Sequence, residues 1–156
     1  MGSVRPAEER DRAALFLLLG RDTALDQPQH HPLVYEDDVS GRILGASTLV
    51  VPAGGDPRIG AVQLRDATRL DVFHALVVAV VQAAVDAGFE FGEAPLVRDR
   101  AVLSFVRTFY AVEPEVTGRD GATGDPIEWR FRVHLPSTLA RITMLPPPTP
   151  GVLPPP

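Results

Sequence analysis

The stretch that decides the fold is residues 59–88, which read IGAVQLRDATRLDVFHALVVAVVQAAVDAG. We interpret residues 59–65 as a strand and residues 69–87 as a long helix that ends at Gly88. The second segment is apolar on nearly all sides, so we expect a buried helix. Its six valines favour a strand instead, but about nineteen residues exceed the usual length of a strand.

Apolar periodicity and turn residues place the other elements. The tetrapeptide 38–41, Asp-Val-Ser-Gly, separates two strand-like runs and indicates a hairpin. The predicted strands are residues 3–6, 33–37, 42–51, 59–65, 89–97, 113–116 and 127–135. The predicted helices are residues 7–21, 69–87 and 98–110 and a short one beyond Ser137, with loops at 22–32, 52–57 and 117–126. This order, β-α-βββ-α-β-α-β(β), is typical of a mixed α/β (α+β) sheet.

Composition excludes several classes of function. The chain has no cysteine and no lysine, which excludes disulfides, thiolate metal sites and lysine bases. Its net charge of −5, with acids and arginines interspersed, argues against nucleic-acid binding. Charged residues precede the first apolar run, and no run is long enough to span a bilayer. We therefore expect a cytoplasmic protein without a membrane partner.

The chain is long enough for a single domain with a substantial core. We place that domain at residues 1–143. Residues 144–156 form a proline-rich tail that favours polyproline II, and its apolar residues suggest contact with a partner or a second copy of the chain, against the alternative of a disordered terminus.

Four phrases resemble the GNAT superfamily of acyl-CoA-dependent N-acyltransferases: VRPAEERDRAALFLLL (4–19), LVYEDDVSGRILGASTLV (33–50), AVDAGFEF (84–91) and RDRAVLSF (98–105). The resemblance implies a mostly antiparallel central sheet flanked by helices. It also implies that the fourth strand, residues 59–65, splays from the fifth, residues 89–97. Acyl-CoA would lie in that opening, with its pantetheine against the fourth strand and its pyrophosphate at the N-terminus of the central helix.

The family's phosphate motif, a basic residue followed by glycines, falls on residues 69–74. Arg69 matches the basic residue, whereas Leu70, Val72 and His74 stand at the glycine positions, where we expect them to obstruct close backbone approach. Asp71 adds a negative charge that suits the helix dipole and opposes a second anion. The cofactor contacts implied by the resemblance are Val62, Leu64, Arg65, Arg69, Leu70, Asp71, Val72 and Arg98. Arg98 replaces the family's asparagine, and Phe105 replaces its tyrosine acid.

No catalytic residue is assigned from the sequence. Tyr35, Glu36 and Tyr110 are candidates for handling a proton, and an ordinary cross-strand or helix surface is the alternative for each. His74 is a base or, more simply, a histidine packed in an apolar helix. The adjacent histidines 30 and 31 fit a loop surface better than a metal site, so no metal is expected.

Arg69 has two interpretations as well. It contacts a bound anion, or it pairs with an acid while Asp66, Thr68 or Asp71 caps the helix.

Three functions are compatible with these observations. In the first, the chain transfers an acetyl or other acyl group from acetyl-CoA or another acyl-CoA to a small-molecule or peptide amine. In the second, it is a non-catalytic binding or assembly protein on the same fold, without a cofactor. In the third, it is an enzyme of this fold that binds another ligand in the same opening, which the sequence does not separate from the second. A homo-oligomer formed through the proline-rich tail fits the second function and is compatible with the first.

Overall fold

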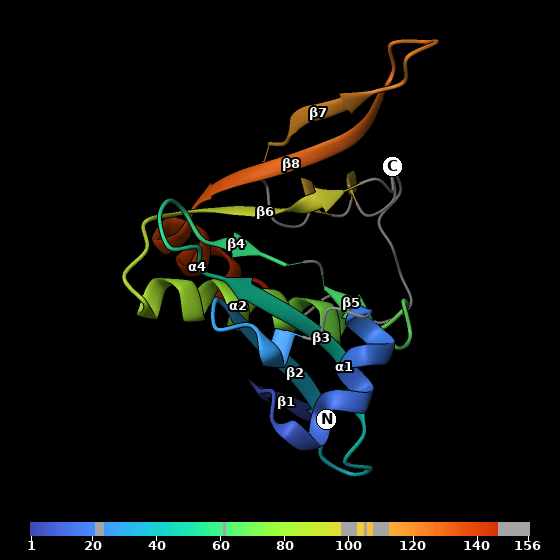
Figure 1. Cartoon of the computed structure of the whole chain (residues 1–156), viewed down its shortest axis with the longest axis vertical. Helices are drawn as coiled ribbons and strands as arrows, with labels where there is room; N and C mark the ends of the chain where they lie inside the picture. Colours follow the sequence, from blue (N-terminus) through green and yellow to red (C-terminus); the bar gives the residue numbers. More distant parts are fainter. Residues whose placement is uncertain (21–23, 61, 98–102, 105, 108–112, 147–156) are drawn as a thin grey trace.

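The computed structural model describes residues 1–20, 24–60, 62–97, 103–104, 106–107 and 113–146. These residues form an eight-stranded sheet with helices on both faces (Figure 1). The strands are β1 (Gly2–Pro6), β2 (His30–Asp37), β3 (Ile43–Val50), β4 (Arg58–Ile59), β5 (Gln63–Leu64), β6 (Phe91–Val97), β7 (Glu115–Arg119) and β8 (Pro126–His134). The helices are α1 (Arg12–Leu19), α2 (Leu70–Asp86) and α4 (Leu135–Thr143), with 3-10 turns η1 (Glu9–Asp11) and η2 (Ala24–Asp26).

The strand order is β1-β2-β3-β4-β6-β8-β7, and β5 pairs with β3 beside β4. The described pairs are antiparallel except for β4 with β6, which run parallel. The predicted fold class, a mixed and mostly antiparallel sheet flanked by helices, is therefore confirmed.

Helix α2 forms because its apolar residues meet the sheet. Its 17 residues include six valines, and three of these, Val72, Val80 and Val81, are almost completely buried. Burial of an apolar side chain contributes about 1.5–3 kcal/mol, more than the few tenths by which valine disfavours a helix. Tertiary packing therefore decides for the helix. Gly88 ends it with a φ of 90°, a backbone conformation that suits glycine.

The two faces of the sheet carry different helices. Along β2, Val34 packs with Leu15 of α1, whereas the next residue, Tyr35, packs with Leu76 of α2. Successive strand residues point to opposite faces, so this alternation places α1 on one face and α2 on the other.

The C-terminal strands complete the core. Residues 127–134 alternate between apolar and polar, which predicts that Ile127, Trp129, Phe131 and Val133 share a buried face of β8. Trp129 and Phe131 are indeed buried and pack with Leu103, whereas Ile127 is 50% exposed. Leu135 and Ile142 of α4 join the cluster of buried residues around α2. Helix α4 therefore packs with α2, whereas α1 has its own cluster with β2 and β3.

The predicted strand 59–65 is wrong in one respect, because it is divided into β4 and β5. The backbone N–H of Gly60 donates to the carbonyl oxygen of Thr48 at 2.6 Å. A Cβ at position 60 would lie only 2.8 Å from that oxygen. The chain thus steps close to β3 at a residue without a side chain, and both short strands pair with β3.

Several predicted boundaries are also wrong. The strand expected at residues 113–116 is β7, which runs from Glu115 to Arg119 and takes three residues from the expected loop 117–126. The loop 22–32 ends earlier than expected, because β2 begins at His30 and its first three residues pair with residues 48–50 of β3. The helix expected from residue 7 begins at Arg12, after Glu8 and Asp11 close a reciprocal capping turn. Helix α4 begins at Leu135 instead of beyond Ser137, because His134 caps it.

The helix predicted at residues 98–110 is only partly described. Residues 103, 104, 106 and 107 are helical, and the other positions lie outside the described residues. Within the described ranges, no helix has the length and apolar character needed to cross a membrane.

Candidate active site

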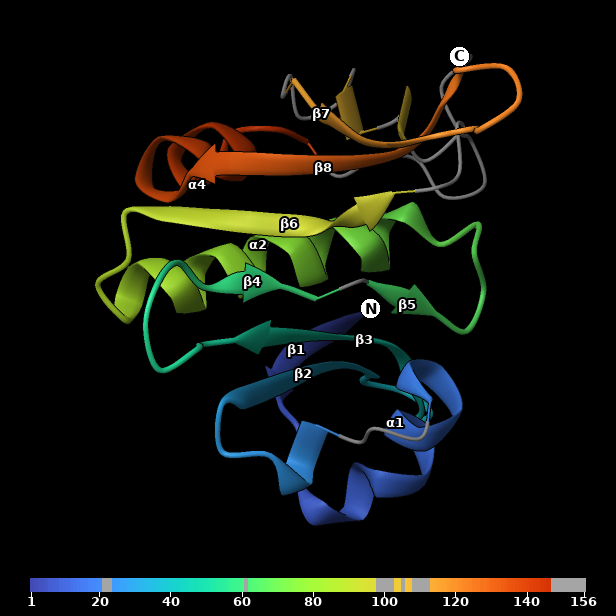
Figure 2. The same ribbon diagram turned by 45° about the horizontal axis from the view of Figure 1, so that its top comes forward.

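Strand pairing in the described sheet continues from β4 to β6 but not from β5 to β6. Arg58 of β4 pairs with Glu93 of β6, and the backbone N–H of Glu93 donates to the carbonyl oxygen of Pro57 at 3.0 Å. In the next strand along the chain, β5, Leu64 pairs with Gly45 of β3. In the described part of the sheet, β5 and β6 are not paired with each other (Figure 2). The strands are thus joined at β4 and parted at β5, as the resemblance implied.

The side of the opening at β5 presents backbone and apolar groups. Val62 and Leu64 are half-buried, and both pack against the cluster of Tyr35, Val72 and Leu76. Their contribution to a bound ligand would therefore come mainly from the main chain. A parted strand can supply it, because its N–H and C=O groups serve an extended ligand as they would serve a neighbouring strand.

Arg65, which follows β5, is held by the neighbouring strand. Its backbone N–H donates to the carbonyl of Leu44 at 2.9 Å, and its Nε donates to the carbonyl of Ile43 at 3.0 Å. These bonds hold the backbone and the Nε atom of Arg65 in place, while the residue as a whole is exposed.

The chain enters α2 through a turn built by Asp66. One oxygen of its carboxylate accepts the backbone N–H of Thr68 at 2.9 Å and its hydroxyl at 2.7 Å. These bonds lower the pKa of Asp66 below its usual value. The backbone N–H of Leu70 then donates to the carbonyl of Thr68 at 2.9 Å.

Arg69 and Asp71 form an ion pair at the first turn of α2. The Nε and Nη2 of Arg69 donate to the two carboxylate oxygens of Asp71 at 2.9 and 2.8 Å. This bond from Arg69 lowers the pKa of the Asp71 carboxyl, and the backbone N–H groups of Val72 and of Asp71 lower it further, against the opposing effect of burial. A negative charge therefore already lies at the helix N-terminus, where the resemblance implied a pyrophosphate.

Three residues of α2 stand at the family's glycine positions. Leu70, Val72 and His74 are all buried, with exposed fractions of 4%, 0% and 7%. Burial lowers the pKa of His74. The charged side chain of the first turn is that of Asp71, which is partly exposed.

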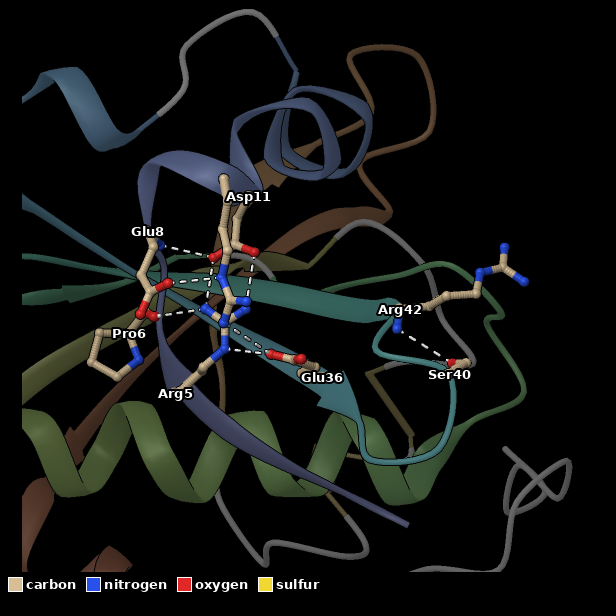
Figure 3. Close-up of polar contacts among 8 residues, drawn as sticks. Arg5, Pro6, Glu8, Asp11, Glu36, Ser40 and Arg42 are labelled. Carbon is tan, nitrogen blue, oxygen red and sulfur yellow. Dashed lines mark hydrogen bonds and ion pairs between the residues drawn. The ribbon is translucent and has the colours of Figure 1, made fainter.

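The catalytic candidates Tyr35 and Glu36 are not brought together. Tyr35 is buried on the α2 face, where burial raises the pKa of its phenol and the charge of Asp71 raises it further. Glu36 lies toward the α1 face, where it accepts the Nε of Arg5 at 2.6 Å (Figure 3). The third candidate, Tyr110, lies outside the described residues, as do Arg98 and Phe105.

Figure 3 shows the cluster that holds Glu36, which the sequence analysis missed. Arg5 donates to both oxygens of Asp11 at 2.7 and 3.0 Å, and Asp11 also accepts the backbone N–H of Glu8 at 2.8 Å. The spacing of Glu8 and Asp11 is that of a capping box and was a usable signal for the turn. The cluster fastens β1, η1 and β2 together, so its role is structural.

The histidines at 30 and 31 lie at the start of β2 instead of in a loop. Within the described ranges, no group of three or more histidines and acids could hold a metal ion.

Comparison with known proteins supplies further evidence on the fold. No sequence-family model matches the chain, and no curated protein matches it in sequence. Among solved structures, it is similar to a Bacillus subtilis acetyltransferase in complex with CoA, with 12% identity over 86% of this chain and 99% of that chain and a TM-score of 0.62. It is also similar to the yncA protein of Salmonella typhimurium with its cofactor acetyl-CoA, with 15% identity over 86% and 94% and a TM-score of 0.64.

A third similar structure is a GCN5-related N-acetyltransferase from Kribbella flavida, with 17% identity over 85% of this chain and 97% of that chain and a TM-score of 0.63. At these identities the likeness concerns the backbone, and it extends over nearly the whole of each related structure. Together with the parted strands β5 and β6, it shows that this chain has the fold of the GNAT acetyltransferases.

Proposed function

We propose that this chain is an N-acyltransferase that binds acyl-CoA in the opening between β5 and β6. The observation that carries the proposal is that β5 is not paired with β6 in the described sheet, although Arg58 of the preceding strand β4 pairs with Glu93 of β6. Two of the similar structures contain CoA or acetyl-CoA, which supports the choice of ligand.

In the proposed reaction, the nitrogen of an amine attacks the carbonyl carbon of the thioester. A C–N bond forms, the C–S bond breaks, the amine loses a proton, and free CoA leaves as the thiol. The residues of β5 offer backbone groups and the apolar side chain of Leu64, so we assign most of the rate to positioning of the two reactants. The acceptor is an amine of a small molecule or a peptide.

Titration calorimetry with acetyl-CoA, followed by hydrogen exchange, tests the proposal. We expect micromolar binding, with slower exchange in the peptides that cover β5 and β6. Peptides that cover β1, at the far edge of the sheet, serve as the internal control and should be unchanged. No binding at millimolar acetyl-CoA, or protection only at β1, contradicts the proposal. A screen of amines for release of the CoA thiol then identifies the acceptor.

One observation favours a second candidate, a binding or assembly protein without acyl-CoA chemistry. The charge of Arg69 is engaged by Asp71, and the helix end carries a carboxylate. This candidate predicts no thiol release with any amine. It also predicts an oligomer that requires the proline-rich tail, which sedimentation of the full chain and of a chain ended after residue 146 would detect.

A further inference from the structure

The ion pair at the N-terminus of α2 bears on which thioester the opening would accept. Helix N-termini favour anions because their first N–H groups lack partners within the helix. Here the carboxylate of Asp71 lies in the first turn of the helix and accepts two bonds from Arg69. A negative charge of the chain itself thus lies at the positive end of the helix and pairs with Arg69.

We propose that Asp71 determines the specificity for the acyl donor. Its charge cancels the gain in affinity that a pyrophosphate bound at α2 would give to acyl-CoA. This inference rests on the proposed function. The donor is held by its pantetheine arm in the opening between β5 and β6, and its phosphates are not bound at α2. The chain therefore accepts short pantetheine thioesters nearly as well as acyl-CoA.

The charges around the helix end support this assignment. The side chains of Arg69 and Asp71 are 36% and 28% exposed, so their charges are only partly screened by solvent. A pyrophosphate approaching the helix end would have to displace the carboxylate or lie next to it. It would also compete for an arginine that already makes two charge-assisted hydrogen bonds in the paired geometry that arginine favours with carboxylates.

The exposed acid just before the helix serves as a matched control. Asp66 carries the same charge five residues earlier, but its carboxylate binds the backbone and hydroxyl of Thr68 and leaves the end of α2 to Asp71. Substituting Asp66 lowers the local negative charge by the same amount without emptying the helix end.

The experiment compares the dissociation constants of CoA and of pantetheine for four proteins: the natural chain, Asp71→Asn, Asp66→Asn and the double variant Arg69→Ala with Asp71→Asn. For the natural chain we expect the two constants to agree within about threefold. Asp71→Asn should tighten CoA about tenfold, the size expected for removal of one nearby like charge, and change pantetheine less than about twofold. Asp66→Asn should leave the ratio unchanged within about twofold. Tighter binding of CoA to Asp71→Asn could come from the loss of a repelling carboxylate or from an Arg69 that is free to bind phosphate. The double variant separates these causes, because it lacks both the carboxylate and the arginine.

The inference can be overturned in two distinguishable ways. If CoA binds the natural chain about a hundredfold more tightly than pantetheine, or if Asp71→Asn leaves the ratio unchanged, the assignment of Asp71 fails while the proposed function stands. If neither ligand binds the natural chain or Asp71→Asn, the proposed function fails and the inference fails with it. Circular dichroism of each variant verifies that the fold is retained.

Discussion

Replacing Asp11 by alanine should destabilise the protein more than replacing Glu36, the other acid that Arg5 binds. The carboxylate of Asp11 is 5% exposed and accepts two bonds from Arg5 and one from the backbone N–H of Glu8. The substitution leaves a mostly buried guanidinium, 21% exposed, without its main partner. Removing one member of a buried pair costs about 3–5 kcal/mol, and the partial exposure of Arg5 reduces this to about 2–3 kcal/mol.

The measurement is urea unfolding at pH 7, followed by circular dichroism, with a thermal melt as a second readout. For a chain of this length, a loss of about 2–3 kcal/mol lowers Tm by about 4–12 °C. Glu36→Gln is the control within the same cluster. Glu36 is 27% exposed and receives one bond from Arg5 at 2.6 Å, so its substitution should cost about 1 kcal/mol or less.

The pH dependence gives an independent check on the reasoning. The bond from Arg5 lowers the pKa of Asp11 in the folded protein. A carboxyl group with a lowered pKa stabilises the fold fully above its unfolded value, near about 3.9, and this contribution disappears as the pH falls through the folded pKa. The difference between the natural chain and Asp11→Ala should therefore be largest at pH 7 and shrink below about pH 4. A difference under about 0.5 kcal/mol at pH 7, or one of equal size at pH 3, would refute this account.

Two further substitutions and one truncation test other parts of the structure. Gly45→Ala should cost about 1–3 kcal/mol in urea unfolding, because its Cβ would lie 2.9 Å from Cδ1 of Leu76, whereas Gly54→Ala meets no atom within 4 Å and should change the stability little. Tyr35→Phe keeps the buried ring and, under the proposed function, should retain acyl transfer within about threefold, since positioning supplies most of the rate; a loss of about a hundredfold would make Tyr35 catalytic. A chain ended after residue 143 should melt below one ended after residue 146, because the first lacks Leu145, which packs against the core; equal melting temperatures would contradict that packing.

The sequence predicts the parts of this fold that depend on local pattern. The apolar run before Gly88 was sufficient for α2, and the alternation around Trp129 was sufficient for β8. The division at Gly60 could not be predicted in the same way. It depends on close approach to Thr48, a residue twelve positions earlier whose proximity only the folded sheet creates.

The candidate site was predicted less completely for the same reason. The sequence left open whether Arg69 binds an anion or an acid, and the geometry of the turn brings it to Asp71. The sequence shows the size of Leu70 and Val72, but only the fold shows that both side chains are buried. The bond between Arg5 and Glu36 joins residues 31 positions apart, and no local pattern announces it.

The parallel pair of Arg58 and Glu93 has a consequence for local unfolding of the protein. Among the described strands, this pair links the half-sheet of β1, β2 and β3 to the half-sheet of β6, β8 and β7, while α2 packs beneath the junction. Local opening events follow the lines of fewest contacts, so the halves should unfold as separate cooperative units once α2 loosens. A ligand that bridges β5 and β6 would join the two half-sheets and make them unfold as one cooperative unit.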